Sequence, residues 1–164
     1  MAAVLSFVMS LFMKKQEFLS AAIAAARQTS AQSNLPAGVT VAQAALESAW
    51  GESRLAQKAN NYFGIKARGD QPFTAMPTTE CEAGEIKKLT ARFARYRSMA
   101  ECFAARDAII LAAPCYAEAR GHARDPVAFI HSLAKHWATD PAYAEKLEAI
   151  YLQHSFASLD AHEE

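Results

Sequence analysis

The sequence predicts a mainly helical α+β domain that carries one β-hairpin. Most of the chain is rich in helix-forming residues, with apolar residues at helical spacing. Residues 68–97 differ, because they contain Thr, Phe and Tyr and alternate between apolar and polar side chains. No internal repeat or low-complexity linker divides the 164 residues, so we expect one domain with a hydrophobic core.

Residues 1–13 form an apolar arm, and we assign residues 14–164 to the domain itself. The apolar run is shorter than the about twenty residues that a membrane-spanning helix needs. Lys14 and Lys15 follow the run, whereas a secretory signal peptide places its positive charges before it. We therefore expect no stable membrane span and no standard signal peptide. The arm packs on the domain as an amphipathic segment or precedes an alternative start at Met13, and a role in export stays open.

The helix expected over residues 39–50 has two distinct faces. Apolar side chains at i, i+3, i+4 and i+7 from Ala42 form a packing face. Gln43, Glu47 and Trp50 lie together on another face. The other helices are expected over residues 14–32, 53–58, 99–111, 115–120, 126–136 and 141–153.

Prolines mark the start of the last two helices. Asp125 precedes Pro126 and Asp140 precedes Pro141, which is typical of an N-cap acid followed by a first-turn proline. Because the hairpin follows the helix that bears Glu47, the helical lobe and the hairpin should flank a cleft. One acid from each could then face the other across a bound polymer.

The composition narrows the possible partners. Lys plus Arg equals Asp plus Glu, at 17 each, so the formal net charge is zero and we expect no nucleic acid partner. The three cysteines have no CxxC spacing and the five histidines no HExxH pair, so we expect no disulfide framework, metal or cofactor. A neutral carbohydrate or a mixed-charge polymer is compatible with this balance.

Glu47 and Glu80 are the candidate catalytic residues. Glycoside hydrolysis commonly uses one carboxylic acid to protonate the leaving oxygen and a second carboxylate to assist. Glu47 has Ala44 and Trp50 one turn away, and apolar surroundings help an acid to keep its proton. Most helical glutamates, however, are solvated surface groups. The alternatives to Glu80 are Glu82, Glu85 and Asp70.

The stretch KANNYFGIKARG, residues 58–69, offers groups suited to sugars. Asn61 could hydrogen-bond an acetamido or hydroxyl group, and Tyr62 and Phe63 could offer aromatic faces. Alternatively, Phe63 and Ile65 anchor the loop in the core.

Four motifs in order resemble the peptidoglycan-cleaving N-acetylglucosaminidases of glycoside hydrolase family seventy-three. They are VAQAALESAWGES, NNYFGIKA, TTEC and WATDPAYAEKL, and the resemblance runs from about residue 14 to residue 153. It implies a lysozyme-like fold, with a helical lobe and a small hairpin lobe flanking the substrate cleft. It also implies an enzyme that cleaves peptidoglycan glycan strands between N-acetylglucosamine and N-acetylmuramic acid. We expect the protein to be a monomer.

The resemblance also assigns roles to residues. Glu47 matches the general acid and Glu80 the second carboxylate on the hairpin. Tyr116 and Trp137 fall where the family lines the cleft, and Asp140 is structural, capping the last helix. The residues expected to bind substrate are Trp50, Asn61, Tyr62, Phe63, Tyr116, Trp137 and Tyr143.

The sequence departs from the family pattern at three positions. Ala49 stands where a glycine is common, Cys81 where a tyrosine is common, and Trp137 where a tyrosine is usual. Tryptophan can stack on a sugar but lacks the phenolic hydroxyl. If that hydroxyl steers the acetamido group, its role falls to Tyr116 or is lost.

Two other functions fit parts of the pattern. A muramidase or lytic transglycosylase would cut the other glycosidic bond, and a non-catalytic cell-wall-binding module would need the cleft but not Glu47. Because the chain shows no export signal and no wall-anchoring repeats, we expect a phage-type endolysin. Such an enzyme is made in the cytoplasm and acts on the cell wall after release.

Overall fold

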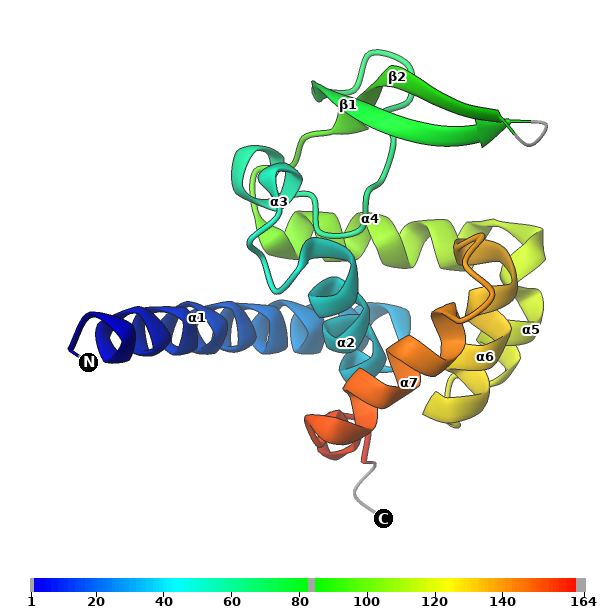
Figure 1. Cartoon of the computed structure of the whole chain (residues 1–164). Helices are drawn as coiled ribbons and strands as arrows, with labels where there is room; N and C mark the ends of the chain where they lie inside the picture. Colours follow the sequence, from blue (N-terminus) through cyan, green and yellow to red (C-terminus); the bar gives the residue numbers. More distant parts are fainter. Residues whose placement is uncertain (1, 83–84, 162–164) are drawn as a thin grey trace.

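The computed structural model describes residues 2–82 and 85–161. Within these ranges a helical body carries one two-stranded antiparallel sheet (Figure 1), which confirms the mainly helical α+β fold. The helices are α1 (Ala2–Ser33), α2 (Ala37–Ser48), α3 (Arg54–Ala59), α4 (Met99–Ala112), α5 (Ala117–Gly121), α6 (Pro126–Trp137) and α7 (Tyr143–Gln153), with 3-10 turns η1 (Pro114–Tyr116) and η2 (Phe156–Leu159).

Helix α2 is the most deeply buried element of the body, because its side chains are small. Its alanines at 42, 44 and 45 are fully buried, and α1, α6, α7 and η2 pack against it. Gly38 allows η2 to approach the helix closely. A Cβ at this position would lie 2.3 Å from the carbonyl oxygen of Phe156, so a larger residue would force η2 away from the helix. The helix that carries Glu47 is therefore held on several sides.

Helix α2 ends two residues before the expected Trp50. Ala49 and Trp50 both have left-handed backbone, with φ of 50° and 58°, and Gly51 follows at 81°. The Ser48 hydroxyl accepts a hydrogen bond from the Gly51 N–H at 2.8 Å and secures the turn. This turn carries Trp50 away from the face of Gln43 and Glu47, so the prediction that the three lie together is wrong for the tryptophan.

Helix α1 begins much earlier than the expected residue 14. Phe18 and Ala22 are buried against the body, whereas Met9, Phe12 and Met13 are exposed. Figure 1 shows the first turns of α1 projecting beyond the body. At these three positions the arm therefore continues the helix instead of packing on the domain. No helix among residues 2–82 and 85–161 is long and apolar enough to cross a membrane.

The hairpin consists of β1 (Phe73–Glu82) and β2 (Glu85–Ala94), as expected within residues 68–97. Phe73 pairs with Ala94 at the base, and the register continues to Glu82 opposite Glu85. The base joins the body through backbone hydrogen bonds, including one from the Ala94 N–H to the Ile65 carbonyl at 2.8 Å. The hairpin therefore stands on the body by one end (Figure 1).

The two N-cap predictions have different outcomes. Asp125 is the N-cap of α6 and accepts a hydrogen bond from the Ala128 N–H at 3.1 Å, as expected. Asp140 accepts from the Ala142 N–H at 2.9 Å, but α7 begins only at Tyr143. Asp140 therefore secures the turn before the helix, and the predicted helix start at residue 141 is two residues early.

Candidate active site

Glu47 lies in the last turn of α2 and is partly buried. Its Oε1 atom accepts two hydrogen bonds, from the Tyr143 hydroxyl at 2.7 Å and from the Trp137 Nε1–H at 3.2 Å. Trp137 is the last residue of α6 and Tyr143 the first of α7. The short connection between these helices therefore brings both donors to one carboxylate oxygen.

Burial raises the pKa of Glu47 above its ordinary value of 4.5, although the hydrogen bonds from Tyr143 and Trp137 act to lower it. Burial and the nearby Glu47 carboxylate raise the pKa of Tyr143 as well, so its hydroxyl stays protonated. A carboxylic acid that holds its proton closer to neutral pH is suited to general acid catalysis.

A chain of buried polar side chains continues behind Tyr143. The Gln43 amide donates to the Tyr143 oxygen at 3.1 Å, and Arg106 Nε donates to Gln43 Oε1 at 2.9 Å. Arg106 is fully buried and forms an ion pair with Asp107 at 2.8 Å, and the Ser33 hydroxyl donates to Asp107 at 2.7 Å. Helices α1, α2, α4 and α7 are thus linked through one polar network.

Sequence reasoning placed Gln43 beside Glu47 but gave it no function, and it missed Arg106 and Asp107. The signal that could have found them is an adjacent Arg-Asp pair within the apolar stretch CFAARDAIIL. Charged residues are rarely buried unless they are paired. A pair of opposite charges in such a stretch therefore indicates a buried polar network.

Tyr116 and Trp137 form an aromatic wall beside Glu47. Their ring centroids lie 6.2 Å apart, and the Phe63 ring lies 6.3 Å from Trp137. A cavity of about 230 Å³ opens at this wall. The structure thus brings Tyr116, Trp137 and Tyr143 into one region with Glu47, and their contact with a sugar stays a prediction. The cavity is lined by Phe63, Gly64, Ile65, Lys66, Arg68, Ile109, Tyr116 and Trp137.

Asn61 has a different role from the expected sugar contact. Its side chain is only 1% exposed. The amide nitrogen donates to the carbonyls of Ile65 at 2.8 Å and Ala94 at 2.9 Å, while Oδ1 accepts from the N–H groups of Phe63 and Ile65. All four hydrogen-bonding positions of the amide are therefore occupied within the protein. Asn61 ties the loop to the base of β2, which corrects the prediction for this residue.

Two other aromatic candidates serve mainly as packing residues. Phe63 is buried and its ring lies 5.1 Å from that of Phe103, so it anchors the loop in the core, as in the alternative reading. Tyr62 is half-buried between Phe18 and Phe103. Phe63 still borders the cavity at the aromatic wall.

Trp50 is also used for packing. Its ring makes edge contacts with Phe18 and with His154, whose ring centroid lies 4.7 Å away. The Lys15 ammonium lies over the ring at 3.7 Å. These contacts come from α1 and from the residue that follows α7, and none of the three partners lines the cavity at the aromatic wall. The structure therefore gives no support to Trp50 as a substrate contact.

Glu80 lies on β1, with its backbone opposite Lys87. Its side chain falls outside the described part of the protein, as do those of the alternatives Glu82 and Glu85. Asp70 precedes β1 and is exposed. The role of Glu80 as second carboxylate therefore stays a prediction. Among the residues that the structure describes, no group of three or more His, Cys, Asp or Glu side chains could hold a metal ion.

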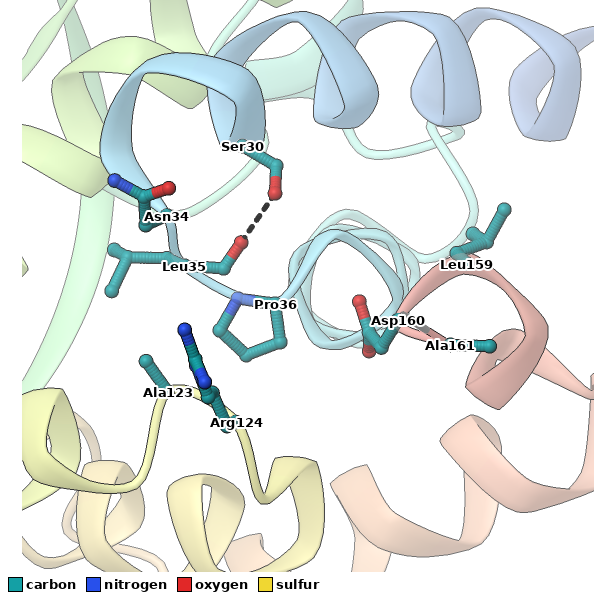
Figure 2. Close-up of a pocket in the computed structure, with 9 residues that line it drawn as sticks. All are labelled: Ser30, Asn34, Leu35, Pro36, Ala123, Arg124, Leu159, Asp160 and Ala161. Atoms are coloured by element: carbon teal, nitrogen blue, oxygen red, sulfur yellow. Dashed lines mark hydrogen bonds between the residues drawn. The ribbon is translucent and has the colours of Figure 1, made fainter. Parts of the chain in front are cut away.

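A second cavity, of about 440 Å³, lies at the other end of α2 (Figure 2). Two of its polar side chains, Ser30 and Asp160, serve local structure. The Ser30 hydroxyl donates to the Leu35 carbonyl at 2.7 Å, and Asp160 accepts from the Gly38 N–H at 2.8 Å. Glu47 lies about 16 Å further along the helix axis, given a rise of about 1.5 Å per residue. This cavity is therefore separate from the candidate active site. It is lined by Ser30, Asn34, Leu35, Pro36, Ala123, Arg124, Leu159, Asp160 and Ala161.

The family model for mannosyl-glycoprotein endo-beta-N-acetylglucosaminidase matches residues 23–156. The peptidoglycan hydrolase FlgJ of Salmonella typhimurium is 35% identical over 144 residues, which cover 84% of this chain and 46% of FlgJ. The exo-glucosaminidase LytG of Bacillus subtilis is 31% identical over 129 residues, which cover 74% of this chain and 45% of LytG. The chain therefore spans about half the length of these curated relatives.

Solved structures agree with this assignment. The catalytic domain of the autolysin Auto from Listeria monocytogenes superposes with a TM-score of 0.79 at 27% identity, covering 89% of this chain and 87% of that domain. A C-terminally truncated glycoside hydrolase domain of Salmonella typhimurium FlgJ gives 0.70 at 36% identity, covering 86% and 97%. The fold and family implied by the sequence motifs are confirmed. The chain belongs to the glucosaminidase family of glycoside hydrolases.

Proposed function

We propose that this protein hydrolyses the β-1,4 bond between N-acetylglucosamine and N-acetylmuramic acid in peptidoglycan, with Glu47 as the general acid. The observation that carries this proposal is the environment of Glu47. Burial raises its pKa, and two side-chain donors hold its Oε1 next to an aromatic wall. The relatives named as a peptidoglycan hydrolase and an exo-glucosaminidase support the substrate class.

The hydrogen bonds around Glu47 suit both the protonated and the deprotonated form of its carboxyl group during bond cleavage. Glu47 protonates the glycosidic oxygen as the bond to the departing sugar breaks. Negative charge then develops on its carboxylate, and the donors Tyr143 and Trp137 are already in place to stabilise that charge. Because the two donors are fixed by helices, they need no rearrangement during the reaction.

Glu80 is the proposed second carboxylate. It either activates water for inversion or orients the acetamido group of the substrate as an internal nucleophile for retention. A separation of roughly 6.5 to 9.5 Å between the two carboxyl groups leaves room for an inverting water, and about 5 Å suits a retaining enzymic nucleophile. Tyr116 and Trp137 are the proposed stacking surface for a sugar ring.

The test is digestion of purified peptidoglycan, borohydride reduction of the products and mass spectrometry of the new reducing ends. Wild type should release reduced glucosamine ends, and Glu47→Gln should lower turnover about 10²- to 10⁴-fold while wall binding is retained. Glu52→Gln is the matched control, because this nearby glutamate is exposed and pairs with Lys14. Its activity should equal that of wild type.

The other outcomes identify the rival functions. Reduced muramic acid ends would indicate a muramidase, and anhydro-muramic ends a lytic transglycosylase. Binding without new ends would indicate a wall-binding module. If Glu80→Gln kept full activity on intact walls, its assigned role would be wrong. The monomeric state and the release from the cytoplasm to the wall stay predictions.

A further inference from the structure

The polar chain behind Glu47 has a defined hydrogen-bond direction. The orientation of a glutamine amide is set by its partners, and for Gln43 the deciding partner is Arg106. A guanidinium has only donors, so the Gln43 oxygen must face Arg106 Nε, at 2.9 Å. The Gln43 NH₂ group therefore faces the Tyr143 oxygen, at 3.1 Å.

This direction determines what Tyr143 can do. Its oxygen accepts from Gln43, and its single hydrogen points to Glu47 Oε1 at 2.7 Å. The indole N–H of Trp137 is also donor-only and reaches the same oxygen. With two hydrogens already directed at Oε1, the acidic proton of Glu47 belongs on Oε2.

We propose that Gln43 and Arg106 are positioning residues that hold Tyr143 as a hydrogen-bond donor and thereby place the transferable proton of Glu47 on Oε2. The proposal rests on the proposed function of Glu47 as general acid. It extends that function to two residues that touch neither the substrate nor the reacting atoms.

The burial of Arg106 supports a role beyond packing. Its side chain is fully buried, and Nη1 donates to Asp107 at 2.8 Å and to the Thr40 hydroxyl at 2.9 Å. Nη2 is buried without a hydrogen-bond partner among the described residues. A buried charge that is incompletely paired costs stability, and an apolar side chain of similar size would avoid that cost. The geometry indicates that Arg106 is retained because its hydrogen bond fixes the orientation of the Gln43 amide.

Among the side chains that the structure describes, few charged groups are hydrogen-bonded into this polar network. The titratable or charged residues that reach Glu47 through it are Tyr143 on α7 and, behind Gln43, Arg106 and Asp107 on α4. Helix α6 contributes Trp137, which does not titrate in this range. A change in the pKa of Glu47 after substitution of Gln43 can therefore be traced to a small number of groups.

The decisive substitution is Gln43→Glu, which preserves side-chain size. A carboxylate at this position would accept from Arg106 and also from the Tyr143 hydroxyl, so Tyr143 would turn away from Glu47. Gln43→Met removes both hydrogen bonds without adding charge and separates this effect from simple charge repulsion. Thr40→Val is the control, because it removes one partner of Arg106 and leaves the contact between Arg106 and Gln43 intact.

Two measurements are made on each variant: the titration of the Glu47 carboxyl group by ¹³C NMR, and kcat and KM as functions of pH. Both Gln43 variants should raise the pKa of Glu47 by about one unit and move the basic limb of kcat to higher pH, because hydrogen bonds to a carboxylate lower its pKa. Maximal kcat should fall about tenfold with KM unchanged. Thr40→Val should lower thermal stability and leave the titration at its wild-type position.

An unchanged Glu47 titration in folded Gln43→Glu and Gln43→Met would overturn the proposal, and so would a shift in the charged variant alone. Because the NMR titration needs no turnover, it tests the positioning role of Gln43 and Arg106 separately from the proposed glucosaminidase activity. If wild type released no glycan ends but the titration still moved, the positioning role would stand and the glucosaminidase proposal would fail. If wild type cleaved the wall and the titration stayed fixed, the positioning role would fail alone.

Discussion

The indole nitrogen of Trp137 donates a hydrogen bond to Glu47 Oε1 at 3.2 Å, although the two residues lie 90 positions apart in the chain. A tyrosine is usual at position 137 in the motif that this chain resembles. The tryptophan therefore has a polar donor at this place, and that donor is directed at the proposed general acid. Although tryptophan lacks the phenolic hydroxyl, this side of Glu47 still accepts a hydrogen bond.

Trp137→Phe should keep an aromatic ring but remove the donor. Because a hydrogen bond to a charged group contributes about 1.5 kcal/mol or more, kcat should fall about tenfold and the basic limb of the pH profile should move to higher pH. Release of reducing ends measured across the pH range checks this. Tyr151→Phe is the control, since its hydroxyl donates to Asp160, at 3.0 Å, instead of to Glu47. An unshifted profile for Trp137→Phe would contradict the prediction.

Glu47→Gln should be more stable than wild type at neutral pH. The folded-state pKa of Glu47 is raised above 4.5, so between the unfolded and folded pKa values the folded protein binds more protons than the unfolded chain. Wild-type stability therefore falls as pH rises through this window, and the loss is complete above the folded pKa. Glutamine cannot ionise and avoids this loss. Urea unfolding from about pH 4 to pH 8 should show that the free energy of unfolding of Glu47→Gln exceeds that of wild type at neutral pH and that this difference disappears at the acid end. A difference that does not depend on pH would refute this account.

Asn61→Ala should destabilise the fold without weakening substrate binding by the folded protein. The substitution removes the hydrogen bonds that the Asn61 amide donates to the Ile65 and Ala94 carbonyls and those that it accepts from the Phe63 and Ile65 N–H groups, at a cost of about 3 kcal/mol. Urea unfolding and KM of the purified variant check this. Gln57→Ala, on the exposed side of α3, should change neither value. A raised KM at unchanged stability would instead restore Asn61 as a sugar contact.

Ala49→Gly should stabilise the protein. Ala49 is exposed and has a φ of 50°, a left-handed conformation that costs a residue with a Cβ atom about 1 to 2 kcal/mol. After the greater freedom of glycine in the unfolded chain is subtracted, the free energy of unfolding should rise by about 0.5 to 1 kcal/mol. Ala24→Gly, on the exposed side of α1, should have the opposite sign. Thermal and urea unfolding of both variants measure the difference.

Helical periodicity and strand alternation identified the helices of the body and the hairpin, because those patterns follow from local burial. They did not locate the end of α2. Alanine and tryptophan seldom adopt positive φ, so the chain composition suggested a helix that continues to residue 50. The position of Trp50 depended on that turn and was predicted wrongly with it.

The site was predictable where a residue acts through its own chemistry and less so where it acts through distant partners. Glu47 was selected from its helix and its motif. Asn61 was misassigned because its partners include the carbonyl of Ala94, 33 positions away, and no local pattern shows that contact. The link between Gln43 and Arg106 spans 63 positions and has the same character. Such long-range polar contacts become visible only when the elements are placed in space.

The hairpin stands on the body by its base, while the described hydrogen bonds that hold Glu47 and its supporting residues come from α2, α4, α6 and α7. Mutations along the two strands therefore leave the support of the acid untouched. During evolution, the hairpin can change in length and sequence while the helical lobe preserves the hydrogen-bonded environment of Glu47. Divergence in this family is thus expected to concentrate at strand positions other than Glu80, the proposed second carboxylate, because changes there leave the hydrogen bonds to Glu47 in place.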